Sequence, residues 1–129
     1  MYLSDEKQFS QDLLEQILSL VESVIARMAA VSSADDLLVT EQGKLLLDAV
    51  CMQYLALGEA VKQLDKHTHG ELLACHPSQD WKGIMGFRDV LAHQYFSVDP
   101  AQVLWISRQA MPQLRLEILL MIQQLTQQH

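Results

Sequence analysis

The residue types best suited to chemistry lie in one short segment, Gly86-Phe87-Arg88-Asp89-Val90-Leu91-Ala92-His93-Gln94-Tyr95-Phe96. An imidazole such as that of His93 titrates near neutral pH and can act as a general acid or base. A guanidinium such as that of Arg88 can bind a phosphate through two N–H groups and can stabilise charge that develops in a transition state. The pair therefore suits phosphodiester cleavage. On residue type alone, however, one Arg and one His in a helix are more often a surface cation and a hydrogen-bonded histidine.

The spacing of these side chains sets a condition on the local structure. On a regular helix Arg88 and Tyr95, seven residues apart, share a face, whereas His93 lies about 140° around the axis from Arg88. His93 and Tyr95 would point in nearly opposite directions. If all three serve one site, the helix must end or distort near His93. The β-branched and aromatic residues after His93, followed by Asp99-Pro100, make such an end reasonable.

The rest of the chain predicts the helices that position this segment. Only 5 Gly and 3 Pro interrupt a sequence rich in good helix formers, which favours an all-α fold over any sheet architecture. We expect helices over about 5–30 and 41–66, a short helical segment over 71–75, a helix from about 80, and a last helix from Asp99-Pro100. Thr40 and Asp99 are the expected N-caps, and Pro112 should kink the last helix. With no repeat or linker, residues 1–129 are expected to form one domain, an antiparallel four- to five-helix bundle.

Two of these helices carry informative apolar patterns. In the second long helix, one face holds residues 45, 49, 52, 56, 59 and 63, and residues 46, 50, 57 and 61 lie beside it. Residues 114–125 of the last helix are apolar on nearly all sides. Such a helix is buried either in the core or against another subunit.

Charge and composition restrict the classes of function. The net charge is −7, but residues 1–48 hold nine acidic and three basic residues, so the later part is nearly neutral. This disfavours tight, non-specific binding to long duplexes. It leaves open a local positive cleft around Lys62, Lys66, Lys82 and Arg88.

The chain start has no signal-peptide pattern, and no apolar run approaches the length of a membrane span. We therefore expect a cytoplasmic protein without membrane association. Cys51 and Cys75 are expected to be reduced thiols, with a disulfide the poorer alternative.

Several motifs together resemble one known family. Arg88-xxxx-His93-x-Tyr95 resembles the Arg-xxxx-His-x-Tyr motif of HepT-like toxins, a branch of the HEPN superfamily. The likeness extends from about residue 45 to 120 with matching order and spacing. It includes Leu57-Gly58-Glu59-Ala60, Trp81-xx-Ile84-x-Gly86-Phe87-Arg88-Asp89, Val98-Asp99-Pro100-xx-Val103-x-Trp105 and Pro112-x-Leu114.

The resemblance implies a HEPN-like helical homodimer whose two motifs line a shared cleft, and a metal-independent RNA endonuclease that needs no cofactor. It implies that Arg88 and His93 are catalytic. It also implies a toxin–antitoxin system, in which a minimal nucleotidyltransferase antitoxin transfers AMP from ATP to Tyr95. Asp89 departs from the family pattern, where Asn is common, and a carboxylate there could orient Arg88 or lower the local positive potential.

Other residues have simpler explanations beside the functional ones. Gly58 can permit close helix approach, and Glu59 can either contribute to the cleft or pair with Lys62. Tyr95 can instead be a half-buried packing residue. Trp81 and Trp105 are expected in the core or at an interface.

The remaining candidates are a possible metal set and a second function. His67, His69, Cys75 and His76 match no recognised zinc spacing, so we expect solvated histidines and no metal site. The alternative function is a non-catalytic scaffold or substrate-binding subunit of a nucleotidyltransferase complex.

Overall fold

The structure is a computed structural model that describes residues 2–127, and all regular secondary structure in that range is helical, with no strand. The long elements are α1 (Tyr2–Met28), α2 (Glu41–His67), α4 (Trp81–Gln94) and a continuous run of α5 (Pro100–Trp105), η3 (Ile106–Ala110) and α6 (Met111–Thr126). The short elements are η1 (Ala34–Leu37), α3 (Glu71–Ala74) and η2 (Tyr95–Ser97). The predicted all-α bundle is confirmed, and the first helix begins at Tyr2, earlier than expected.

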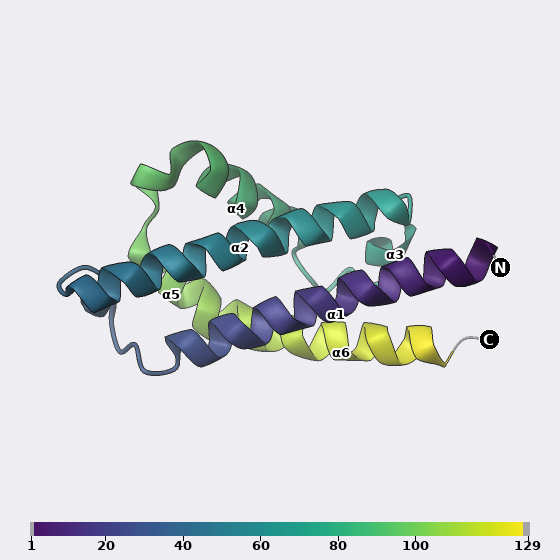
Figure 1. The fold of residues 1–129 in the computed structure, drawn as a ribbon, viewed down its shortest axis with the longest axis horizontal. Coiled ribbons are helices and arrows are strands. Elements are labelled where there is room, and N and C mark those ends of the chain that lie inside the picture. Colours follow the sequence, from purple (N-terminus) through teal and green to yellow (C-terminus); the bar gives the residue numbers. More distant parts are fainter. Residues whose placement is uncertain (1, 128–129) are drawn as a thin grey trace.

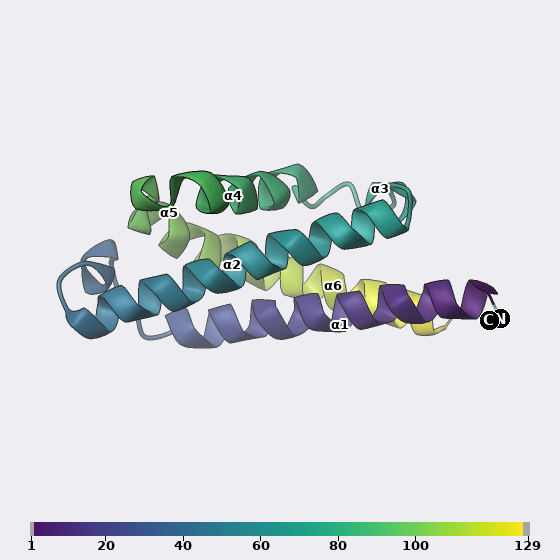
Figure 2. The same ribbon diagram turned by 45° about the horizontal axis from the view of Figure 1, so that its top comes forward.

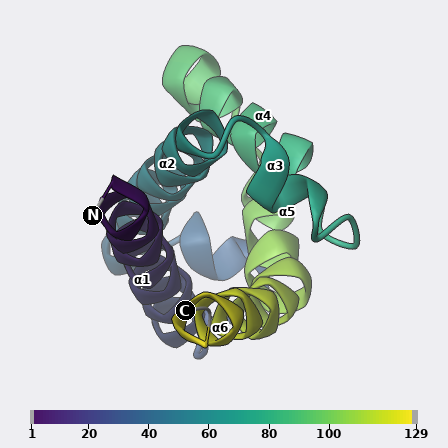
Figure 3. The ribbon, with the colours of Figure 1, turned by 90° about the vertical axis from the view of Figure 1, so that its right-hand side faces the viewer.

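The long helices run alternately up and down. In Figure 1, α2 returns antiparallel to α1, α4 runs back along α2, and α6 returns toward the end where α1 begins. The tilted view in Figure 2 shows α4 lying along the outer side of α2. Viewed along the rods in Figure 3, α1, α2, α4 and α5–α6 follow one another around the bundle. This order follows from short connections, which make consecutive helices antiparallel neighbours.

Polar side chains cap the beginnings of α2 and α5. Thr40 accepts a hydrogen bond from the Gly43 N–H at 2.9 Å, so it caps α2 as the sequence predicts. Asp99 accepts one from the Ala101 N–H at 3.0 Å and caps α5. Each cap satisfies a backbone donor that has no carbonyl partner within its helix. These starts are therefore determined locally.

The last helix contains a π-helical turn where a kink was expected. Over Ile106–Ala110 the backbone widens, and the Met111 N–H bonds to the Ile106 carbonyl, five residues back. Pro112 follows directly, has no N–H, and in a regular helix its ring would clash with the carbonyl four residues earlier. A π-turn before the proline relieves this clash without ending the helix.

The core decides which predicted face of each helix is buried. On α2, the set beside the first face packs inward, because Val50, Leu57 and Val61 are at most 1% exposed while Leu45 and Met52 are more than 60% exposed. On α6, Leu114, Ile118 and Met121 are buried and Leu116, Leu119 and Leu120 are exposed. Part of the apolar surface of α6 therefore remains exposed on the single chain.

Two further observations concern membrane-spanning helices and the cysteines. Within residues 2–127, no helix is both long enough and apolar enough to cross a membrane. Cys51 is buried and Cys75 is exposed, and both are free thiols, as expected.

Candidate functional site

Helix α4 carries the candidate residues and is fixed at its beginning by two side chains. Asp80 accepts a hydrogen bond from the Gly83 N–H at 2.9 Å and caps the helix. The buried Trp81 ring donates its Nε1–H to the His76 carbonyl at 2.9 Å. These contacts set the rotation of α4 about its axis, and therefore the direction in which Arg88 leaves it.

Arg88 lies directly against α2 because position 58 has no side chain. A β-carbon built at Gly58 would lie 2.3 Å from the Arg88 Cβ and 2.9 Å from its Cγ, closer than real atoms approach. The predicted close approach at Gly58 is thus confirmed. It brings the guanidinium beside Glu59, whose Oε2 lies 3.2 Å from the buried Arg88 Nε. Arg88 and Glu59 therefore form an ion pair, but the Arg88 Nε–H makes no hydrogen bond within the described residues.

Asp89 connects this arginine to a lysine on α2. Its Oδ1 accepts a hydrogen bond from Lys62 Nζ at 2.6 Å and one from Arg88 Nη1 at 3.3 Å. Hydrogen bonding to Lys62, with a smaller contribution from Arg88, lowers the pKa of the Asp89 carboxyl below its ordinary value. Lys62 therefore pairs with Asp89 across the two helices, whereas Glu59 pairs with Arg88.

His93 is held by the backbone of the same aspartate. Its Nδ1 lies 2.9 Å from the Asp89 carbonyl oxygen, and since a carbonyl only accepts, Nδ1 carries the hydrogen. In the neutral ring, the lone pair is then on Nε2. His93 is exposed, and no described residue hydrogen-bonds Nε2. Asp89 thus orients the arginine through its side chain and the histidine through its main chain.

The charges of this cluster balance. Glu59 and Asp89 supply two negative charges, and Lys62 and Arg88 supply two positive ones. The sequence suggested a positive cleft formed by Lys62, Lys66, Lys82 and Arg88. Two of these, Lys62 and Arg88, lie close together because both contact Asp89. A phosphate that binds Arg88 must therefore compete with carboxylates that already contact the guanidinium.

Tyr95 lies in a different environment from Arg88 and His93. Helix α4 ends at Gln94, whose φ of −137° and ψ of 39° are not helical, and Tyr95 begins the 3₁₀ turn η2. The helix end expected near His93 is confirmed. The Tyr95 hydroxyl donates to the Asp48 carboxylate, and burial, followed by this carboxylate, raises the pKa of the phenol.

Within one chain Tyr95 and Arg88 contact different parts of α2. Asp48 and Glu59, the α2 partners of Tyr95 and Arg88, are eleven residues apart, roughly 16 Å along a helix. Each of the two carboxylates holds one motif residue against α2. The helix end therefore changes the direction of Tyr95 without bringing its hydroxyl to the guanidinium.

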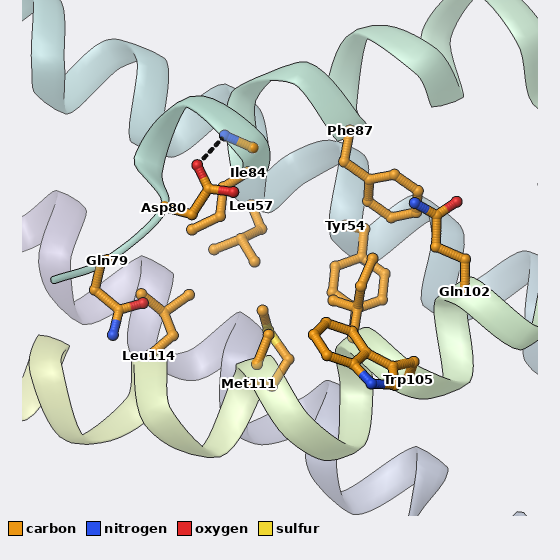
Figure 4. A pocket seen from close by; sticks show the side chains of 13 residues that line it. Tyr54, Leu57, Gln79, Asp80, Ile84, Phe87, Gln102, Trp105, Met111 and Leu114 are labelled. Carbon is orange, nitrogen blue, oxygen red and sulfur yellow. Dashed lines mark hydrogen bonds between the residues drawn. The ribbon is translucent and has the colours of Figure 1, made fainter.

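A cavity of about 280 Å³ lies on another side of α4, between that helix and α5–α6. Figure 4 shows Phe87, Tyr54 and Trp105 facing this space, with Met111 and Leu114 from α6. Gln79, Asp80 and Gln102 also line it. The sequence did not indicate this cavity, because residues from α2, from α4 and the loop before it, and from the α5–α6 run form its wall.

One of the two tryptophans lies in the core, and the histidine-rich segment differs partly from expectation. Trp81 is buried, whereas Trp105 is 62% exposed, so an interface position for Trp105 stays a prediction. His76 is not solvated, because it is 8% exposed and its Nδ1 lies 2.8 Å from Glu117 Oε2. Ser78 donates to the other Glu117 oxygen at 3.1 Å. These contacts attach the loop before α4 to α6, which explains the burial.

Two residues that support the site were not singled out for these roles. Asp48 precedes Tyr95 by 47 residues, so no local motif connects them. Lys62 was named for a positive cleft, yet its partner is Asp89 on another helix. In residues 2–127 no group of three or more His, Cys, Asp or Glu side chains is placed to hold a metal ion.

Comparison with known proteins gives a consistent result. A family model described as "Ribonuclease HepT-like" matches residues 14–121. A curated protein of Caldanaerobacter subterraneus subsp. tengcongensis, described as "Putative RNase TTE0752", is 35% identical over 92 residues, which cover 71% of this chain and 74% of that protein. No solved structure matches the chain.

Proposed function

The chain belongs to the HepT-like ribonuclease family, and on that premise we propose that it is the RNA-cleaving toxin of a toxin–antitoxin system. The observation that carries the proposal is the double role of Asp89. Its carboxylate contacts Arg88 Nη1 and its carbonyl holds His93 Nδ1, so one residue orients a phosphate-binding group and a proton-transfer group.

The proposed reaction uses the chemistry of RNA itself. His93 Nε2 takes the proton of a ribose 2′-hydroxyl, whose oxygen attacks the adjacent phosphorus. The bond from phosphorus to the 5′-oxygen breaks, and this oxygen takes a proton from the protonated imidazole of a second chain's His93. The products are a 2′,3′-cyclic phosphate end and a 5′-hydroxyl end. Arg88 stabilises the negative charge that develops on the phosphoryl oxygens, and Lys62 and Asp89 keep the guanidinium in place.

We further propose that the active form is a homodimer. A single chain offers one Arg88 and one His93, whereas cleavage needs a group that removes a proton and a group that supplies one. Two-fold pairing of the α4 ends would supply both. Exposed apolar side chains at that end, Phe96 at 102% and Val90 at 42%, suit such a contact.

The proposed regulation is transfer of AMP to Tyr95 by a minimal nucleotidyltransferase antitoxin. An AMP group is bulky and anionic, and on Tyr95 it would obstruct the surface at the end of α4. In the single chain the hydroxyl contacts Asp48, not Arg88, so blocking by steric exclusion fits the geometry better than pairing of the new phosphate with the same chain's guanidinium.

The test is incubation of the purified chain with total cellular RNA, with and without EDTA. We expect cleavage in both conditions and fragments that end in 2′,3′-cyclic phosphate. Absence of cleavage by a folded, dimeric protein would favour the second candidate, a non-catalytic scaffold subunit of a nucleotidyltransferase complex. Cleavage that stops with EDTA would contradict the metal-independent reaction.

A further inference from the structure

The hydrogen bond between Tyr95 and Asp48 connects two helices at the end of α4. The phenol hydroxyl donates its hydrogen to the carboxylate Oδ1, so the oxygen lone pairs remain available. Asp48 is exposed on α2, and Tyr95 is half-buried. A carboxylate in direct contact with a hydroxyl is the arrangement of a nucleophile and its base.

The position of the phenol is fixed by its surroundings. Its ring forms one wall of a hollow of about 340 Å³, which is also lined by Asp48, Cys51, Met52, Leu55 and Leu91. The non-helical Gln94 backbone turns the ring toward α2. Asp48 and Met52, which also line the hollow, are exposed, so the hollow is open to the surface of the chain.

The phenol needs a base if it is to react. An ordinary tyrosine has a pKa near 10, and burial together with the Asp48 charge raises that of Tyr95 further. At neutral pH the hydroxyl therefore stays protonated until a reaction removes the proton. Among the described residues, the Asp48 carboxylate is the side chain hydrogen-bonded to this hydroxyl.

We propose that Asp48 is the proton acceptor that makes the Tyr95 hydroxyl a nucleophile, an inference that rests on the proposed modification of Tyr95. The phenol oxygen attacks the α-phosphorus of ATP and forms a phosphodiester bond with AMP. The bond between the α-phosphorus and the bridging oxygen breaks, and pyrophosphate leaves with the electron pair. The phenol proton moves to Asp48 Oδ1. The modified chain thus supplies its own base.

The first experiment needs no partner protein. The chain is treated with N-acetylimidazole at neutral pH, and acetylation of the Tyr95 peptide is followed by mass spectrometry, with buried Tyr54 as an internal reference. Asp48→Asn keeps an oxygen that accepts the phenol hydrogen bond but is not basic. We expect Tyr95 acetylation to slow about 100-fold. Asp65→Asn, the same change elsewhere on α2, should react like the unaltered chain.

A purely structural carboxylate predicts the opposite result. If Asp48 only holds the ring, Asp48→Asn removes a negative charge that raises the phenol pKa, and acetylation of Tyr95 should stay equal or accelerate. Either outcome overturns the proposal. Equal thermal unfolding of the two Asn variants and the unaltered chain shows that the comparison concerns folded protein.

The second experiment separates this inference from the proposed regulation. The chain is incubated with a minimal nucleotidyltransferase and ATP, and addition of AMP to the Tyr95 peptide is timed. Modification of the unaltered chain with about 100-fold slower modification of Asp48→Asn supports both proposals. Equal rates overturn the role of Asp48 alone. No modification of the unaltered chain overturns the regulation, while the acetylation result still decides the chemistry of Asp48.

Discussion

Gly58 on α2 lies so close to Arg88 on α4 that a β-carbon at position 58 would stand 2.3 Å from the Arg88 Cβ. The absence of a side chain on one helix therefore sets where the guanidinium leaves the other. In the same stretch of α2, Glu59 and Lys62 reach the Arg88–Asp89 pair. Packing against Gly58 and the charge of Glu59 therefore both act on Arg88.

Gly58→Ala should destabilise the fold and disturb the site. The added methyl group must displace α4 or force the chain off its favoured geometry, at a cost of about 1–3 kcal/mol in the free energy of unfolding. RNA cleavage should fall as well, because Arg88 moves with α4. Gly86→Ala is the matched control, since nothing lies within 4 Å of its built β-carbon. It should stabilise the helix by roughly 0.5–1 kcal/mol. Urea unfolding measures both, and a Gly58→Ala variant as stable as the original chain would contradict the close approach.

Arg88→Ala and His93→Ala should each reduce RNA cleavage by about 100-fold or more and abolish growth toxicity, because one loses phosphate binding and the other proton transfer. Both side chains are at least partly exposed, so the variants should remain folded by circular dichroism. Arg115→Ala and His69→Asn change the same residue types away from α4 and should cleave normally. Wild-type rates in both α4 variants would show that the catalytic assignment is wrong.

The contact between Lys62 and Asp89 should add stability only above acidic pH. The folded-state pKa of Asp89 lies below its ordinary value of 3.8, so the unfolded chain binds more protons than the folded one in this window. The stabilisation is fully present above pH 3.8 and is lost as pH falls through the lower, folded-state pKa. Urea unfolding of the original chain and Asp89→Asn at several pH values measures the difference. Lys62→Gln removes the main cause of the lowered Asp89 pKa, so in that background the pH dependence of the stability difference should largely disappear. A stability difference between the original chain and Asp89→Asn that does not change with pH would count against the pairing.

The chain should form a homodimer at micromolar concentration, with a mass by light scattering of twice 14.6 kDa. Burial of exposed Phe96 and Val90 at the end of α4 would stabilise it. Phe96→Asp should shift the population toward monomer, because a carboxylate would be buried at the contact. A stable monomer of the original chain would refute the shared cleft.

Tyr95→Phe should separate regulation from cleavage. It removes the oxygen that would accept AMP but keeps the ring in its hollow, so the variant should remain toxic and should no longer be silenced by the nucleotidyltransferase with ATP. The unaltered Tyr95 peptide should gain the mass of AMP under the same conditions. Full silencing of the Phe variant, with no mass gain on Tyr95 of the original, would end the switch hypothesis and favour a packing role for the ring.

By itself the sequence determined the features that depend on near neighbours. The caps Thr40 and Asp99 bond to N–H groups three and two residues away, so composition and spacing were sufficient to find them. The helix end near His93 was predictable for the same reason. The motif around Arg88 and His93 identified the family, which the matched residues 14–121 confirm. The catalytic roles stay predictions, as does the single domain over residues 1–129.

Only the tertiary structure decided which distant groups surround the motif. The sequence offered two adjacent apolar faces on α2, and burial of Val50 and Leu57 selected between them. That rotation sets Lys62 against Asp89 and Asp48 against Tyr95, partners 27 and 47 residues apart. The physical reason is that nothing in the sequence near a carboxylate or ammonium group indicates which distant residue it will pair with. Its partner depends on how the helices pack, and that packing is set by burial of the whole core.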